Sequence, residues 1–224
     1  MELSPFLQAA KSGDLEALKK SEKKADINET TKSGSSALIF AAQNNDFEMV
    51  KHLVEKGADP NLKTSMGGTA LNRAAELGNV EMMKYLLDNK AEVGNLALIV
   101  AAREGNIDAV KLLIEHGADI DAEQRWGQTA LMQASKEGNA EVVSYLIKQG
   151  ANVKKKDNNG ETALSIADDN EQMDIAGQLQ RAGAKIEKKA EPVDEPDDEE
   201  DDEIDIDELV DEEEMPDDVD LEDD

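Results

Sequence analysis

The stretch GQTALMQASKEGNAEVVSYLIKQGAN, from Gly127 to Asn152, decides the fold of this chain. It contains two short apolar runs, each preceded by a residue that can cap a helix and followed by a glycine. The same order of residue types returns from the start of the chain to about residue 186. Self-similarity of this length is typical of a stack of similar structural layers, so we treat the stretch as one unit of an internal repeat.

A leucine that follows alanine sets the register of the repeat. Successive leucines of this kind are 33, 27, 33 and 33 residues apart, and Phe6 lies 32 residues before the first. They are Leu38, Leu71, Leu98, Leu131 and Leu164. The register predicts six units, at approximately 1–30, 31–63, 64–93, 94–122, 123–156 and 157–186, followed by a separate segment at 187–224.

Each unit carries signals for two short helices. A hydroxyl side chain that can cap a first helix precedes the apolar step in five units: Ser4, Ser36, Thr69, Thr129 and Thr162. A residue that tolerates a left-handed backbone then breaks the chain: Gly13, Asn45, Gly78, Gly105 and Gly138. The predicted caps of the second helices are Asp14, Asp46, Asn79, Asn106, Asn139 and Gln172.

The second helices have apolar residues at positions i, i+3, i+6 and i+7, which predicts one inward stripe. Phe47, Val50, Leu53 and Val54 are an example. An acid stands two residues after each second cap, near the positive end of the predicted helix dipole. These acids are Glu16, Glu48, Glu81, Asp108, Glu141 and Asp174.

This pattern resembles the ankyrin repeat family over roughly residues 4 to 186. The Gly-Xaa-Thr-Ala-Leu starts and the Gly-Ala-Asp ends carry the resemblance. It implies an all-α solenoid of helix-turn-helix units with short β-hairpin-like finger loops. The family's Thr-Pro-Leu-His is replaced here, as by Thr-Ala-Leu-Asn at 69–72, and no unit has the histidine. The hydrogen bonds that this histidine supplies between units are therefore expected to be missing.

One junction is shorter than the others. Between Glu92 and Leu96 the 27-residue spacing leaves out six residues of the 33-residue period, at the place where the resemblance implies a finger. Surface loops tolerate changes in length, so this gap is either a neutral shortening or an opening that admits a loop of a partner.

The resemblance also implies a binding face, because partners of the family contact the finger tips and the exposed side of the first helices. The predicted contact residues on fingers are Lys32, Ser33, Ser35, Lys63, Ser65, Met66, Arg125, Trp126, Gln128, Asn158 and Asn159, with Lys156 and Glu161 beside them. Those at helix ends are Gln43, Asn44, Glu76, Leu77, Arg103, Glu104, Lys136 and Glu137, with Asp169 and Asn170 in the last unit.

Trp126 is the only tryptophan of the chain, and Arg125 is adjacent. Trp and Arg are enriched in binding hot spots, so one interpretation is direct contact with a partner. The other is that the ring packs over a neighbouring finger. Met66 and Leu77 are predicted to be exposed on the same face and favour a binding patch.

The net charge of −28 comes mostly from the C-terminal segment. Residues 190–224 hold 23 Asp or Glu and no Lys or Arg, which leaves 29 acids against 24 bases in the rest of the chain. High charge with little apolar area predicts disorder for 187–224. Three roles stay open for it: a solubility tail, a docking segment for a basic protein, or a cover for the basic run Lys154–Lys156.

Several classes of function are not expected. The chain has no cysteine, and its two histidines, His52 and His116, are predicted to lie on the surface without a catalytic partner. No phosphate loop or zinc motif occurs, so we expect no enzyme, cofactor or metal site. No apolar run approaches the ~20 residues that span a bilayer, and no signal peptide is visible, which favours a soluble cytoplasmic protein. Direct binding of nucleic acid is not expected, because the repeat region is net negative.

The leading hypothesis is therefore a non-enzymatic module, monomeric alone, that binds another protein, one option being a partner with a basic surface. The acidic tail would add electrostatic steering or a second contact. The alternative is an acidic mimic or holdase whose tail occupies the nucleic-acid-binding surfaces of basic proteins. A third class is a structural subunit of a larger assembly.

Overall fold

The computed structural model describes residues 3–185, and within them the chain forms twelve α-helices arranged as six helix-turn-helix pairs. The helices are α1 (Pro5–Ser12), α2 (Leu15–Ser21), α3 (Ala37–Gln43), α4 (Phe47–Glu55), α5 (Ala70–Glu76), α6 (Val80–Asp88), α7 (Asn95–Arg103), α8 (Ile107–Glu115), α9 (Ala130–Glu137), α10 (Ala140–Lys148), α11 (Ala163–Asp169) and α12 (Met173–Arg181), with a 3-10 turn η1 (Glu22–Lys24) after α2. This range has no strand beyond two isolated bridges, Thr30 with Ser36 and Lys156 with Thr162.

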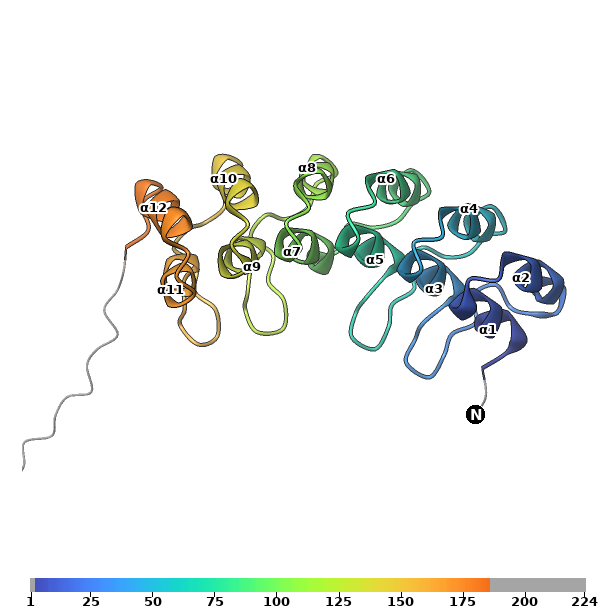
Figure 1. Ribbon diagram of the computed structural model, residues 1–224. Coiled ribbons are helices and arrows are strands. Elements are labelled where there is room, and N and C mark those ends of the chain that lie inside the picture. The colour runs from blue at the N-terminus through green and yellow to red at the C-terminus, as the bar shows by residue number, and fades with distance from the viewer. Residues whose placement is uncertain (1–2, 186–224) are drawn as a thin grey trace, which may run out of the picture. The chain divides into compact units, whose positions relative to one another are not determined.

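The helices form two layers (Figure 1). The first helices of the pairs pack side by side in one layer, as α7 does between α5 and α9. They are the odd-numbered helices from α1 to α11. The second helices lie in the other layer. The predicted all-α solenoid is therefore confirmed. The boundaries of the units stay predictions, and the predicted acidic tail lies outside the described residues.

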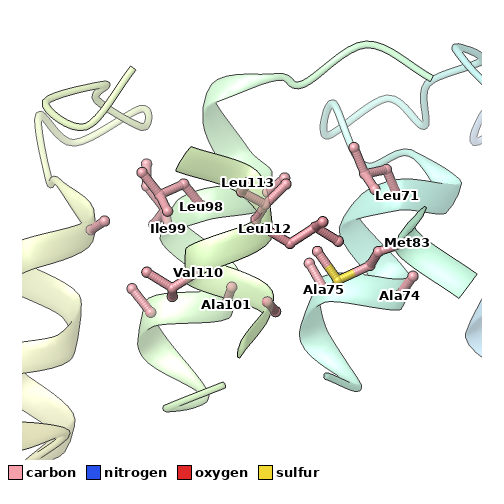
Figure 2. Packing of buried hydrophobic residues seen from close by; sticks show 14 of the residues in the cluster. Leu71, Ala74, Ala75, Met83, Leu98, Ile99, Ala101, Val110, Leu112 and Leu113 are labelled. Atoms are coloured by element: carbon pink, nitrogen blue, oxygen red, sulfur yellow. The ribbon is translucent and has the colours of Figure 1, made fainter. Parts of the chain in front are cut away.

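The leucines that set the register are all buried in one continuous core. Leu38, Leu71, Leu98, Leu131 and Leu164 belong to it. The small alanines of the first helices let neighbouring helix pairs approach closely. Figure 2 shows Ala74 and Ala75 beside Met83 in the third pair, and Leu98 with Leu113 in the fourth. Each helix pair thus buries its apolar surface against the neighbouring pairs rather than around a single centre.

The inward stripe of the second helices differs from the prediction. In α4, Val50 and Leu53 are buried, but Phe47 and Val54 are only partly buried. Met49, which the stripe omitted, is fully buried. The equivalent residues Met82, Ala109 and Val142 are also buried. Position i+2 turns inward because second helices pack against the first helix of their own pair and, as α6 does with α8, against a neighbouring second helix, which widens the buried face.

The predicted caps of the first helices are confirmed. Ser36 Oγ accepts a hydrogen bond from the Ile39 amide at 3.3 Å, and Thr69 Oγ1 accepts one from the Asn72 amide at 3.2 Å. Ser4, Thr129 and Thr162 do the same. Each satisfies one of the amides that the opening turn leaves without a partner.

The predicted second caps all stand at the N-cap position. Asp14, Asp46 and Asn79 accept a capping bond there, but the side chains of Asn106, Asn139 and Gln172 make none. Asn139 Nδ2 instead donates to the carbonyls of Ala102 and Arg103 at 3.0 and 2.8 Å. Asn106 makes the equivalent contact in the unit before, where its side chain donates to the carbonyls of Ala75 and Glu76. These side chains therefore supply hydrogen bonds between units that do not depend on the histidine of the family pattern. The free carbonyls at the end of a first helix provide the acceptors.

Candidate functional site

Four loops project from the first-helix layer (Figure 1). We call them finger 1 (31–35), finger 2 (64–68), finger 3 (124–128) and finger 4 (157–161). Each is closed by a backbone hydrogen bond from its first to its last residue, at 3.0, 2.9, 3.0 and 2.9 Å. A first-residue side chain also accepts from the last amide in three fingers: Thr31, Thr64 and Asp157. This local bonding makes each finger a defined turn rather than an open loop.

The fingers are joined in two pairs. The Ser65 amide donates to the Ser33 carbonyl at 2.8 Å, and the Asn158 amide donates to the Trp126 carbonyl at 3.1 Å. The approach is close: a Cβ on Gly127, which has φ +75°, would lie 2.6 Å from Asn158 Oδ1. Glycine is therefore required at this place. Fingers 1 and 2 support each other, as do fingers 3 and 4.

No finger stands between the two pairs (Figure 1). The gap is the connection 89–94 from α6 to α7, which is held by a bond from the Glu92 amide to Asn61 Oδ1 at 2.8 Å. Leu96 occupies the place of the capping Ser or Thr of other units, and α7 begins before it, at Asn95, with Gly94 as an N-cap that makes no side-chain bond. The predicted shortening is thus a break in the finger row.

Most predicted finger residues are exposed: Lys32, Ser33, Lys63, Ser65, Met66, Arg125, Trp126, Asn158 and Asn159, and so is the flanking Lys156. Ser35 and Gln128 are partly buried, as is the flanking Glu161. Gln128 Oε1 accepts from the side chains of Gln124 and Gln133 at 2.9 and 2.7 Å. Its amide oxygen therefore holds finger 3 against α9.

At the helix ends, Gln43, Asn44, Leu77, Glu104, Lys136 and Glu137 are exposed, with Asp169 and Asn170. Asn44 Nδ2 donates to the Ala10 carbonyl at 3.1 Å, so this side chain joins two units.

Two of the predicted helix-end residues, Glu76 and Arg103, lie in an ion-pair network. Glu76 bonds to Arg73 Nη1 at 2.7 Å and lies 3.6 Å from Arg103 Nη2, while Arg103 Nε bonds to Glu104 at 2.8 Å. Arg73 was absent from the predicted set. Its i, i+3 spacing to Glu76 is the signal that could have found it.

Large apolar side chains are exposed on two fingers and at the end of one first helix. Met66 at the tip of finger 2 is 90% exposed, Trp126 on finger 3 is 59% exposed, and Leu77 at the end of α5 is 48% exposed. The Arg125 guanidinium lies 5.3 Å from the centre of the Trp126 ring, a cation–π contact. A fourth exposed apolar residue in the described part of the chain, Met173, lies on α12.

The predicted surface position of His52 is wrong. Its Nε2 lies 2.6 Å from Glu22 Oε2 of the preceding unit, and the two side chains are only 17% and 18% exposed. The hydrogen bond from His52 lowers the pKa of Glu22 below its ordinary value of 4.5, and Lys56, 3.9 Å away, acts in the same direction. Sequence spacing gives no signal for this pair, because its members belong to different units.

The basic run Lys154–Lys156 is also partly neutralised by the fold. Lys155 Nζ lies 2.8 Å from Glu123 Oε1 and donates to the Asp121 carbonyl at 2.6 Å. The hydrogen bond to Glu123 raises the pKa of Lys155 above its ordinary value. Whether the acidic tail covers this run involves residues outside the described range.

Within residues 3–185 no group of three or more His, Asp or Glu side chains has the arrangement of a metal site. No helix in the same range has both the length and the apolar character needed to cross a membrane. What the described surface offers is two rigid finger pairs, a gap between them and exposed apolar tips.

Comparison with known proteins adds one match. The family model described as ankyrin repeats (3 copies) matches residues 6–97 and 98–190. No curated protein matches the chain.

Proposed function

The chain belongs to the ankyrin repeat family, and on this premise we propose that it is a non-enzymatic module that binds a partner protein through its fingers and the exposed side of its first helices. Ankyrin repeats are generally protein–protein interaction modules. We call this surface the finger face; it comprises fingers 1 to 4 and the C-terminal ends of α3, α5, α7 and α9.

The exposure of Met66 and Trp126 on hydrogen-bonded fingers carries this proposal. A large apolar side chain held on a rigid turn loses little conformational entropy when it is buried against a partner. Trp in particular supplies a large desolvated area and is enriched among hot spots. The neighbouring Arg125 adds a cation beside the ring.

The acidic segment at residues 190–224 gives the second part of the proposal. Its 23 acids and absence of bases favour a partner with a basic surface. Long-range attraction of this kind raises association rates and weakens as salt shortens the Debye length to about 8 Å at physiological ionic strength. We expect the association rate, more than the dissociation rate, to depend on salt and on the tail.

The same charge also supports a second candidate, in which the tail alone acts as a mimic of nucleic acid on basic proteins. A peptide of residues 187–224 would then compete with DNA or RNA for the partner without the repeats. In the leading proposal this peptide competes poorly, because most of the affinity comes from the finger face.

The test begins with proteins retained by the immobilised full chain and then measures affinity for each purified candidate. Trp126→Ala is expected to weaken binding by about 30-fold, the effect of removing a hot spot of about 2 kcal/mol. Met173→Ala is the matched control, because Met173 is 68% exposed on α12, outside the finger face. Equal affinities for Trp126→Ala, Met66→Ala and Met173→Ala would refute the assignment of the face.

A further inference from the structure

The gap leaves two backbone groups without the partners that equivalent groups have elsewhere in the finger row. In each finger pair, the amide of the second residue of one finger donates to the carbonyl of the third residue of the finger before it. Ser65 donates to Ser33 and Asn158 donates to Trp126 in this way. By the same register, the carbonyl of Met66 and the amide of Arg125 are the groups that a finger in the gap would bond. Neither makes a backbone hydrogen bond in the described part of the chain.

The gap is wide enough for one finger but not for a folded domain. Adjacent packed helices lie about 8–10 Å apart, so the absence of one finger separates fingers 2 and 3 by roughly 20 Å. Neighbouring extended segments need about 5 Å each in the hydrogen-bonding direction. A single turn with its two arms therefore fits between the pairs.

The borders of the gap are apolar on both sides. Met66 and Trp126 stand on the two fingers that flank it. On the floor, Val93 and Leu96 are partly buried, while Gly94 and Asn95 are exposed. Two of the four large apolar residues exposed in the described range, Met66 and Trp126, thus stand on the fingers that flank the gap.

The charges at the borders favour an acidic occupant. Lys63 is exposed immediately before finger 2, and Arg125 is exposed on finger 3. No acid of the described residues forms an ion pair with either. The acids Glu76 and Glu104 are paired with arginines. The connection 89–94 itself carries one exposed cation, Lys90, and one exposed acid, Glu92, so the balance is three cations against one acid.

We propose that the gap is a docking site for an acidic loop of the partner protein, which completes the row as the missing finger. The loop donates a backbone hydrogen bond to the Met66 carbonyl and accepts one from the Arg125 amide. An apolar side chain of the loop lies between Met66 and Trp126, and its acids lie near Lys63 and Arg125. This inference rests on the proposed function and specifies the part of the partner that enters the finger face.

The test selects ligands from random twelve-residue peptides displayed on phage, with the immobilised full chain as target. Enriched peptides are expected to carry an apolar residue flanked by Asp or Glu. Because Trp126 is the only tryptophan, synthetic enriched peptides without tryptophan should change its fluorescence in a saturable way. The selection is made in the presence of excess peptide 187–224, which removes ligands of the acidic tail. Enrichment of basic peptides under this condition, or no enrichment at all, would overturn the inference.

A variant with a filled gap gives the sharper comparison. Residues 92–96 are replaced by a copy of residues 26–36, which contain finger 1 and place the same number of residues between the flanking alanines as the other junctions have. Circular dichroism and gel filtration establish that the variant is folded. The selected peptides should bind it at least about tenfold more weakly than the natural chain. Unchanged binding would overturn the inference.

Charge reversal covers the case in which the filled-gap variant does not fold. The double variant Lys63→Glu with Arg125→Glu should have an affinity for the selected peptides that is lower by about tenfold or more. Lys32→Glu on finger 1, away from the gap, should change this affinity little. If Lys32→Glu has an equal effect, the site is not the gap. Peptides or purified partners that respond to Trp126→Ala but not to gap filling would leave the proposed function standing and refute this inference alone.

Discussion

Gly105→Ala tests whether asparagine side chains join the layers of the stack. Gly105 ends the turn after α7 with φ +73°, and a Cβ there would lie 2.6 Å from Asn139 Oδ1. Asn139 would have to move and lose its bonds to Ala102 and Arg103. Gly117 is the matched control in the same unit, because its φ is +84° and a Cβ there would meet nothing within 4 Å.

The two substitutions share one cost and differ in the other. An alanine in the left-handed region costs about 1–2 kcal/mol, and this is the whole expected loss for Gly117→Ala. Gly105→Ala adds the loss of two hydrogen bonds, about 0.5–1.5 kcal/mol each. We therefore expect the free energy of unfolding to fall by roughly 1–3 kcal/mol more for Gly105→Ala than for Gly117→Ala.

The assay is equilibrium unfolding in urea followed by circular dichroism, with the m-value compared between variants to detect partial unfolding of the stack. A double-mutant cycle isolates the contact. In an Asn139→Ala background, Gly105→Ala should cost no more than Gly117→Ala does. Equal costs for the two glycines in the natural background would refute the role assigned to Asn139.

Three further predictions concern stability. Leu98→Ala should lower the free energy of unfolding by about 2–5 kcal/mol in the same assay, because Leu98 is buried between layers; a loss below 1 kcal/mol would contradict its place in the core. Ser36→Ala should cost about 1 kcal/mol through loss of its cap, whereas Leu96→Ser should give no gain, since Leu96 lies inside α7; a gain would show that the capping position had been restored. The pKa of Glu22 is lower in the folded chain than its ordinary value of 4.5. Its pair with His52 therefore stabilises the fold at pH values above 4.5, and this contribution is lost as pH falls through the lowered pKa of the folded state. Melting temperatures of the natural chain and Glu22→Gln should therefore converge below that pH, and a difference that is constant with pH would contradict the pairing.

The sequence predicted the order of the helices and the turns between them, which depend on residues close together in the chain. The hydroxyl caps such as Ser36 act on an amide three residues ahead, and the left-handed positions such as Gly105 are set by the local backbone. The 27-residue spacing located the gap for the same reason, because a finger needs residues to build it. Local periodicity, repeated six times, is sufficient evidence for the helix pairs and their order.

Features that depend on a neighbouring unit of the stack were decided only by the tertiary structure. Asn139 could have capped its own helix, as Asn79 does, but its amide reaches the carbonyls of the preceding unit. His52 contacts Glu22 of the preceding unit. The Met66 carbonyl and the Arg125 amide are recognised as lacking backbone partners only when the equivalent bonds of the other fingers are compared. Sequence separation near one repeat length carries no information about side-chain direction. The direction is set by which acceptor or apolar surface the neighbouring layer brings within reach.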